Sequence, residues 1–359
     1  MNKKCILLHG ATNCNSSNYG DFIYGRMIYD YLENNDMDAY FYQPSLFFKE
    51  KLAKYDNKAK PKRYSKMVFI PGGYFGEGHN ARVRDNVIQF LRFFPIGIKS
   101  SVMKKKMCVL GIGAGPIDSL LMKIGVKIIC NHSDFITTRD YESYQTLKKL
   151  CPKANIINTG DLIITQDFKQ DINQTKFRQI KDILKRKKDK KILLIHYNHS
   201  EEALEKFAKA ANIFTSKNED YYTVVASDSI LKNENELYEK FKSIFKNSSY
   251  HFVYGDADEL SQLIQISDLI VTCKLHVGVV GCTMGKSVVS VACHPEKTKR
   301  FYKQIENEER CISLYESNEF MITKLMEKYE GLKIHISDVL RKESEITWCK
   351  FEDFIKDEK

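Results

Sequence analysis

Short apolar segments alternate along this chain with longer amphipathic segments, and this alternation is the feature that most constrains the fold. The apolar segments are predicted to be strands, and those of the first half begin near residues 4, 66, 106, 134 and 155. A polar, charged interval from about residue 166 to residue 190 interrupts the pattern, which restarts at Lys191. Strands that alternate with helices over such spacings predict parallel sheets with helices on both faces.

The chain is predicted to form two domains, because 359 residues exceed what one typical hydrophobic core holds. We expect an α/β protein with two Rossmann-like domains that face a central cleft. Their predicted limits are residues 1–166 and 191–359, with a linker over 167–190 and a helical tail from about residue 300. The single tryptophan, Trp348, is predicted to anchor the last helix in a core.

The net charge of +10 favours anionic partners such as nucleic acid, lipid head groups or phosphorylated small molecules. The lysines are dispersed, and the densest basic run is KRKKDKK at residues 185–191. We interpret this run as a solvated linker in preference to a membrane-surface patch. It lacks the interleaved aromatic residues that RNA-binding sheets use, so no nucleic-acid partner is expected.

The cysteine pattern and the absence of long apolar runs predict a cytoplasmic protein. The ten cysteines are scattered singly, with no C-x-x-C pair, which argues against a zinc ribbon and a disulfide framework. No apolar run approaches the roughly 20 residues that cross a bilayer, and the N-terminal apolar segment is too short for a secretory signal. The histidines show no strong metal-binding spacing, so no metal is expected.

Polar and Gly-rich residues follow most of the predicted strands. Ligands of open α/β sheets bind beyond the carboxyl ends of the strands, so these positions form the candidate site. They are His9–Gly10, Gly72–Gly73, Gly111–Gly115, Arg139–Asp140, Gly160–Asp161, His196, Asp228, Gly255–Asp256 and Lys274–His276.

Two Gly-rich segments resemble phosphate-binding loops without matching them. GCTMGKS would need glycine at Val280 to form a P-loop, so Gly285 is predicted to end a helix whose carbonyls Lys286 caps. GIGAGP at residues 111–116 has Pro116 where a dinucleotide fingerprint has its third glycine. Its glycines indicate that the backbone lies close either to a ligand or to a neighbouring helix.

His276 is the strongest candidate for acid–base chemistry. It is predicted to lie at a helix start, where free N–H groups and the positive end of the helix dipole attract anions. The dipole lowers the pKa of a histidine and a bound phosphate raises it, so the pKa of His276 is predicted to fall near neutrality. The alternative is a buried structural histidine.

Two further segments place polar residues at predicted helix starts. Arg139 suits bidentate recognition of a phosphate or carboxylate, and its alternative is a surface ion pair with a neighbouring acid. Asn18 and Asp21 lie at the start of the first predicted helix. In one interpretation they face a ligand, and in the other they form an ordinary N-cap turn.

Taken in order, these segments resemble the polysaccharide pyruvyltransferase family. The matching segments are NYGD (18–21), PGGYFGEG (71–78), GIGAGP (111–116), RDYES (139–143) and KLH (274–276) with its small-residue helix and following strand. The resemblance covers about residues 1–305. Lys274 stands where the family has arginine, and Phe22 stands where the family has an acidic residue.

The resemblance implies a GT-B-like fold in which phosphoenolpyruvate is the donor and no other cofactor acts. The product would be a pyruvate ketal on a bacterial surface polysaccharide, such as a capsule or exopolysaccharide, or on its lipid-linked precursor. The N-terminal domain would bind the acceptor and the C-terminal domain the donor. Peripheral association with the inner face of the cytoplasmic membrane is expected if the acceptor is lipid-linked. The sequence leaves the acceptor sugar and the oligomeric state open.

The resemblance also assigns roles to residues of this chain. His276, Arg139 and Asp21 would be catalytic. The donor phosphate and carboxylate would be bound by Arg139, Lys274, His276, Gly278 and Lys297. The acceptor would be bound by Asn18, Gly72, Gly73 and Gly113.

Two alternatives remain open from the sequence. A nucleotide-sugar glycosyltransferase shares the fold, but Glu296 is followed eight positions later by Gln304, so the E-x7-E spacing of many such enzymes is missing. A non-catalytic anion-binding scaffold is the second alternative, against which the intact His276 and Arg139 argue.

Overall fold

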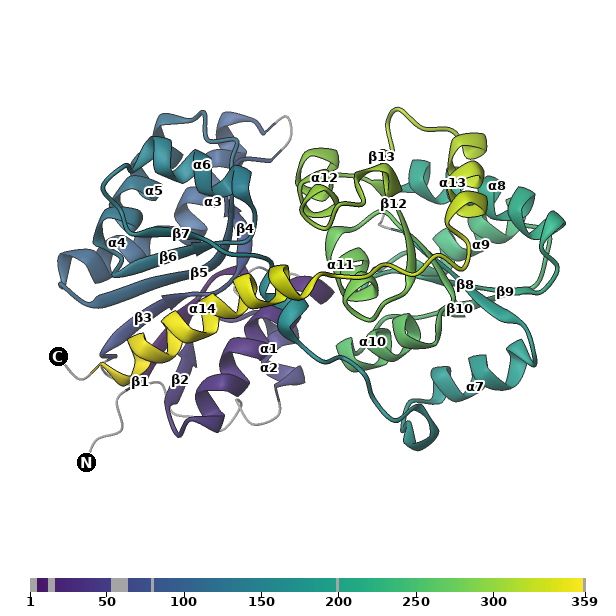
Figure 1. Ribbon diagram of the computed structural model, residues 1–359, viewed down its shortest axis with the longest axis horizontal. Coiled ribbons are helices and arrows are strands. Elements are labelled where there is room, and N and C mark those ends of the chain that lie inside the picture. The colour runs from purple at the N-terminus through teal and green to yellow at the C-terminus, as the bar shows by residue number, and fades with distance from the viewer. Residues whose placement is uncertain (1–4, 12–16, 53–63, 79–80, 198–199, 358–359) are drawn as a thin grey trace. The chain divides into compact units, whose positions relative to one another are not determined.

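The chain folds into two α/β units, each built around one parallel sheet (Figure 1). The computed structural model describes residues 5–11, 17–52, 64–78, 81–197 and 200–357. The first unit holds the described residues up to Ser17, then Asp21–Thr165 and the chain from Asp338 onward. The second unit holds Asn18–Gly20 and Gln166–Ser337. The predicted pair of parallel-sheet α/β domains is therefore confirmed.

The first unit contains a seven-stranded sheet with the order β2-β1-β3-β5-β6-β7, and β4 pairs with β5 beyond the end of β3. All described pairings in it are parallel. Its strands are β1 (Cys5–His9), β2 (Asp38–Phe41), β3 (Lys66–Phe69), β4 (Gly72–Phe75), β5 (Lys106–Ala114), β6 (Phe135–Thr138) and β7 (Ile156–Asn158).

The second unit contains a six-stranded sheet with the order β10-β9-β8-β11-β12-β13, again parallel in its described pairings. The central strands are almost wholly buried, as expected for strands covered by helices on both faces. The strands are β8 (Lys191–His196), β9 (Tyr221–Ala226), β10 (Ser249–Phe252), β11 (Leu269–Thr272), β12 (Ser287–Ala292) and β13 (Cys311–Ser313).

Helices cover both faces of each sheet (Figure 1). Those of the first unit are α1 (Tyr19–Asn34, whose first two residues belong to the second unit), α2 (Leu46–Lys51), α3 (Val83–Phe93), α4 (Pro95–Val102), α5 (Leu120–His132), α6 (Tyr141–Leu150), the 3-10 helix η2 (Leu162–Thr165) and α14 (Asp338–Lys356). Those of the second unit are η3 (Ile172–Gln174), α7 (Arg178–Lys187), α8 (Glu201–Lys217), α9 (Glu234–Ile244), α10 (Ala257–Ile266), α11 (Leu275–Thr283), α12 (Pro295–Gln304), η4 (Glu308–Arg310) and α13 (Glu319–Tyr329).

The unit limits differ from the predicted domain limits in three places. Residues 167–190, expected to be a linker, form η3 and α7 and belong to the second unit. Residues from Asp338 onward, expected in the second domain, belong to the first unit. Asn18–Gly20, expected in the first domain, belong to the second unit. Of the helices described, none combines the length and apolarity needed to span a membrane.

The last helix, α14, is held in the first unit by polar contacts at its C-terminal end and by an aromatic contact within the helix. The buried Lys66 ammonium donates to the carbonyl of Phe354, to that of Ile355 at 3.1 Å and to that of Asp357 at 2.7 Å. A cation that caps the last carbonyls of a helix also complements the helix dipole. Trp348 stacks on Tyr31 of α1 with ring centroids 4.6 Å apart. Because the chain returns to the first unit at Asp338, the limits of the units differ from the domain limits predicted from strand alternation.

Candidate functional site

Arg139 lies at the carboxyl end of β6, directly before the start of α6. The next residue, Asp140, is the N-cap of α6, and its carboxylate accepts a hydrogen bond from the Ser143 backbone at 2.7 Å. The Ser143 hydroxyl in turn accepts a hydrogen bond from the Ala114 backbone at 2.8 Å, which ties this helix start to the end of β5. The Asp140 side chain thus satisfies one of the free N–H groups at the start of α6.

The Arg139 guanidinium is buried among acidic and phenolic groups of the first unit. Its Nε lies 3.6 Å from an Asp140 carboxylate oxygen, and it hydrogen-bonds the side chain of Tyr24. Burial by itself would lower the pKa of Arg139, but Tyr24, Asp140 and Asp161 outweigh that effect and raise it. The arginine therefore stays charged, and it neutralises carboxylates of its own unit.

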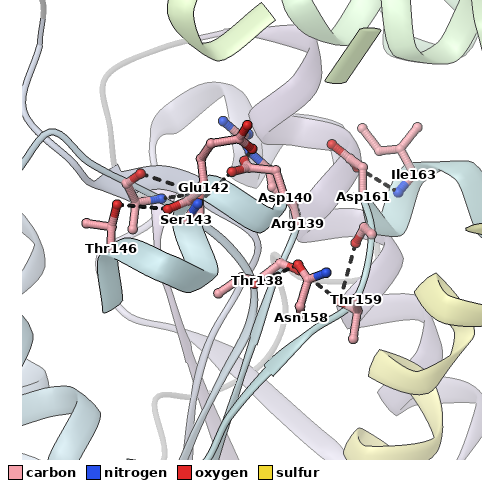
Figure 2. Close-up of polar contacts among 12 residues, drawn as sticks. Thr138, Arg139, Asp140, Glu142, Ser143, Thr146, Asn158, Thr159, Asp161 and Ile163 are labelled. Carbon is pink, nitrogen blue, oxygen red and sulfur yellow. Dashed lines mark hydrogen bonds and ion pairs between the residues drawn. The ribbon is translucent and has the colours of Figure 1, made fainter. Parts of the chain in front are cut away.

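Asp161 and Tyr24 complete this buried group. The Tyr24 hydroxyl donates to both carboxylate oxygens of Asp161 at 2.8 Å, and the Ile163 backbone donates to the same carboxylate at 3.0 Å. Burial raises the pKa of Asp161, although Arg139 and these donors favour its charged form. Figure 2 shows Arg139, Asp140 and Asp161 as neighbours at the carboxyl ends of β6 and β7.

The glycines predicted to bind an acceptor lie within strands of the first unit. Gly72 and Gly73 belong to β4, and Gly72 pairs with Ile112 of β5. Gly113 belongs to β5, and a Cβ added there would lie 2.7 Å from the Arg139 guanidinium. Gly115 has φ +85 and approaches Thr146 of α6. The close approach at GIGAGP is thus to a side chain and a helix of the same unit.

In the second unit, β11 ends at Thr272 and α11 begins at Leu275. Lys274 is the N-cap of α11 and makes no side-chain capping hydrogen bond, because an ammonium group cannot accept one. His276 lies in the first turn of α11 and is half-buried. Gly285 ends the segment after α11 with φ +70, so its predicted helix-ending role is confirmed.

His196, at the carboxyl end of β8, supports this helix start. Its Nδ1 lies 2.8 Å from the Thr272 hydroxyl, and that hydroxyl accepts a hydrogen bond from the Lys274 backbone at 3.1 Å. Burial lowers the pKa of His196 to about 4, helped by the charge of Lys274 and opposed by Asp228 and Glu234. A buried neutral imidazole therefore fixes the turn that carries Lys274 and His276.

Asn18–Gly20 belong to the second unit and lie next to His276. Asn18 donates from its amide to the Asp228 carboxylate at 2.9 Å and accepts from the Gly20 backbone at 3.1 Å. A Cβ added at Gly20 would lie 1.9 Å from His276 Nδ1, so only glycine leaves room for the imidazole. Asn18 therefore makes the predicted N-cap turn, and the residue that it caps, Gly20, lies against the His276 imidazole.

The two remaining donor candidates lie on helices of the second unit. Gly278 belongs to α11, and a Cβ added there would lie 2.9 Å from the Tyr302 hydroxyl. A glycine at this position therefore lets α11 pack closely against Tyr302 of α12. Lys297 is half-buried in the first turns of α12.

The structure divides the candidates between the units. The second unit brings together Asn18, Lys274 and His276 and also holds Gly278 and Lys297, whereas the first unit holds Asp21, Gly72, Gly73, Gly113 and Arg139. Sequence patterns did not reveal the roles of Tyr24 and Thr272, since a tyrosine inside a helix and a threonine ending a strand are common. Among the described residues, no group of His, Cys, Asp and Glu side chains is arranged to hold a metal ion.

Comparisons with known proteins identify the family of the chain. The family model for polysaccharide pyruvyl transferases matches residues 18–295. No curated protein matches the chain.

The fold is similar to that of several solved structures. One is a protein assigned as a UDP-N-acetylglucosamine 2-epimerase from Listeria monocytogenes, with TM-score 0.67 and 12% identity over 99% of this chain and 96% of that one. Another is the UDP-GlcNAc 2-epimerase of Neisseria meningitidis bound to UDP-GlcNAc, with TM-score 0.64 and 12% identity over 99% and 100%. A third is a glycosyltransferase from Rickettsia africae, with TM-score 0.50 and 12% identity over 99% and 100%. These likenesses establish a GT-B-like fold.

Proposed function

The chain belongs to the polysaccharide pyruvyl transferase family, and we propose that it transfers pyruvate from phosphoenolpyruvate to two hydroxyls of a sugar. The product is a pyruvate ketal on a surface polysaccharide or on its lipid-linked precursor. The observation that carries this proposal is the family match over residues 18–295, which includes Asn18, Arg139 and His276.

The proposed reaction needs one proton donor and two nucleophilic hydroxyls. Protonation of the methylene carbon of phosphoenolpyruvate makes the adjacent carbon electrophilic, and the first sugar hydroxyl attacks that carbon. The second hydroxyl then forms a bond to the same carbon as the bond to phosphate breaks. One hydroxyl proton ends on the new methyl group, and the other leaves with inorganic phosphate.

The start of α11 is the proposed donor site. Backbone N–H groups of a helix start bind anions, and Lys274 adds a positive charge at the N-cap. Gly278 and Lys297 belong to this site in the proposal. His276, in the first turn, supplies the proton to the methylene carbon or takes one from a hydroxyl. Gly20 leaves room for this imidazole. The hydrogen bonds that link His196, Thr272 and the Lys274 backbone hold the turn that carries it.

Arg139 is proposed to stabilise charge on the donor as the reaction proceeds. Because its guanidinium already contacts Asp140 and Tyr24, it can do so only while it also balances its own carboxylates. Asn18, Gly72, Gly73 and Gly113 are proposed for the acceptor, with Asp21 as the base that accepts a hydroxyl proton. The protein is proposed to act in the cytoplasm, without a metal or further cofactor.

Thermal unfolding in the presence of phosphoenolpyruvate, UDP, GDP or CMP tests the donor. A ligand at 100 times its Kd stabilises the folded protein by about 2.7 kcal/mol, which raises Tm by a few degrees. We expect a rise with phosphoenolpyruvate alone, and its loss in Lys274→Gln. Lys274→Gln is preferred over Arg139→Ala, because removal of the buried Arg139 would itself destabilise the protein. A rise with UDP alone would favour a nucleotide-sugar glycosyltransferase instead.

A turnover assay completes the test. Release of inorganic phosphate from phosphoenolpyruvate that depends on an added saccharide acceptor is the expected result. Ligand binding without phosphate release by any acceptor of a broad saccharide panel would favour the non-catalytic scaffold.

A further inference from the structure

The first unit exposes aliphatic side chains on two adjacent helices. On α3, Val83 is 81% exposed, Leu91 is 64% exposed and Val87 is also exposed. On α5, which packs against α3, Leu120 is 73% exposed and Ile124 is also exposed. We call these five residues the aliphatic patch.

Helical spacing makes the patch continuous along each helix. Val83, Val87 and Leu91 are four residues apart and therefore lie on one face of α3, and Leu120 and Ile124 do the same on α5. The opposite faces of both helices contribute Phe93, Val126 and Ile129 to the core of the unit. Figure 1 shows α3, α4 and α5 on the face of the first sheet opposite α14 and α1. The patch is thus an outward surface of a well-packed layer.

The segment that carries the patch also carries most of the net positive charge of the chain. Residues 81–132 contain nine Lys and Arg but only two Asp and Glu, so this segment supplies seven of the ten surplus positive charges. Arg82, Arg84 and Lys127 are exposed beside the patch, whereas Lys106 forms an ion pair with Asp357. The one acidic residue of α3, Asp85, accepts a hydrogen bond from the Arg82 backbone at the start of its own helix.

We propose that the aliphatic patch docks the protein onto an anionic lipid bilayer. Surface-lying amphipathic helices bind bilayers through buried apolar area together with basic residues that face anionic head groups, and this surface offers both. A second copy of the chain fits the patch less well, because pairing would bring two strongly basic surfaces together. The basic run at 185–191, on α7 of the second unit and after it, has no comparable exposed aliphatic stripe beside it among the described residues.

Docking onto a bilayer does not require the proposed pyruvyl transfer. If the acceptor is lipid-linked, docking would bring the protein to the membrane that holds the acceptor. The test therefore omits phosphoenolpyruvate and saccharide. The whole chain is sedimented with vesicles of phosphatidylcholine alone and of phosphatidylcholine mixed with phosphatidylglycerol. We expect binding to the mixed vesicles that weakens steeply with added salt.

Two sets of variants separate the contributions of charge and apolar area. Arg84→Gln with Lys127→Gln should weaken binding to the mixed vesicles about 25-fold, at about fivefold for each charge removed. Val83→Gln, Leu91→Gln and Leu120→Gln together should weaken it about tenfold or more. Glutamine suits a helix and the replaced side chains are exposed, so folding is preserved. The matched control is Phe320→Gln on α13, whose side chain is 62% exposed in the second unit, and it should bind like the unmodified chain.

Three results would overturn the proposal. Equal binding to neutral and anionic vesicles would remove the role of the basic residues. Unchanged binding in the aliphatic variants would remove the role of the patch. A dimer in sedimentation velocity that the aliphatic variants dissociate would assign the patch to a second copy of the chain.

Discussion

Arg139 and Lys274 occupy matching places in their units, since each lies within two residues of a strand end and opens a helix. At Arg139 the following residue, Asp140, caps α6 with its side chain, and the guanidinium is buried between carboxylates. At Lys274 the N-cap side chain makes no capping bond, and the turn is instead fixed from behind by Thr272 and His196. The same strand-to-helix junction therefore lies in a buried ion-pair network in the first unit, whereas in the second unit it carries the donor site that we propose.

This difference changes how mutational data on the two residues should be interpreted. Replacement of a buried, paired arginine lowers activity partly because it destabilises the folded protein. Replacement of a half-buried N-cap lysine should lower activity mostly because it weakens binding of the proposed donor. The following experiments separate the two.

The largest expected effect is on the stability of the first unit. Arg139→Met leaves the buried Asp140 and Asp161 without their shared cation, and breaking such a buried pair costs about 3–5 kcal/mol of the free energy of unfolding. Urea unfolding measures this loss. Lys274→Met should change the free energy of unfolding by about 0.5 kcal/mol at most, because its side chain is only half-buried.

The double variant Arg139→Met with Asp161→Asn is the matched control. Removal of the facing charge should recover part of the stability, since it eliminates one uncompensated carboxylate. Equal destabilisation by Arg139→Met and Lys274→Met would contradict the contrast between the two helix starts.

The next effect is on catalysis in the second unit. His276→Ala should lower phosphate release from phosphoenolpyruvate by about 10²-fold or more, as expected for a positioned acid–base group, while the unfolding curve stays close to that of the unmodified chain. Gly20→Ala should reproduce much of this loss although His276 itself is retained, because the new Cβ would displace the imidazole at Nδ1. Unmodified turnover in His276→Ala would exclude the catalytic role.

The two units also share a buried histidine at the end of their first strand, with different surroundings. His9 of β1 hydrogen-bonds the Phe93 carbonyl at 3.0 Å and packs against Tyr42 and Phe69, whereas His196 of β8 contacts Thr272. Burial lowers the pKa of each to about 4, from 6.5.

Between pH 6.5 and pH 4 the unfolded chain binds more protons at these histidines than the folded chain does. Each histidine therefore contributes to the free energy of unfolding above pH 6.5, and this contribution is lost as the pH falls towards 4. The loss per histidine is about 2 kcal/mol between pH 7 and pH 5. Unfolding in urea at the two pH values measures it. His9→Asn and His196→Asn should each remove only their own share. If neither variant changes how the free energy of unfolding depends on pH, other groups cause the acid sensitivity.

Strand alternation was sufficient to predict the two parallel sheets, because buried strands must be apolar and helices must cover them. It could not predict the return of α14 to the first unit, since the contacts that fix it involve Lys66 and Trp348 across most of the chain length. Nor could it show that Gly113 makes room for Arg139, because a glycine carries the same signal whether a ligand or a side chain approaches it. Local sequence identified the candidate residues, and tertiary contacts decided how each is held.

The smallest expected effect concerns the lysine that stands where the family has arginine. Lys274→Arg should lower the KM for phosphoenolpyruvate by a few-fold with little change in kcat, because a guanidinium can grip a carboxylate or phosphate with two parallel hydrogen bonds where an ammonium acts as a point charge. The N-cap backbone and its bond to Thr272 do not depend on the side chain, so the turn should persist. Steady-state kinetics measures both constants. A higher KM in Lys274→Arg would mean that this helix start is shaped around the ammonium, and that the second unit, like the first, has fitted its basic residue to specific neighbours.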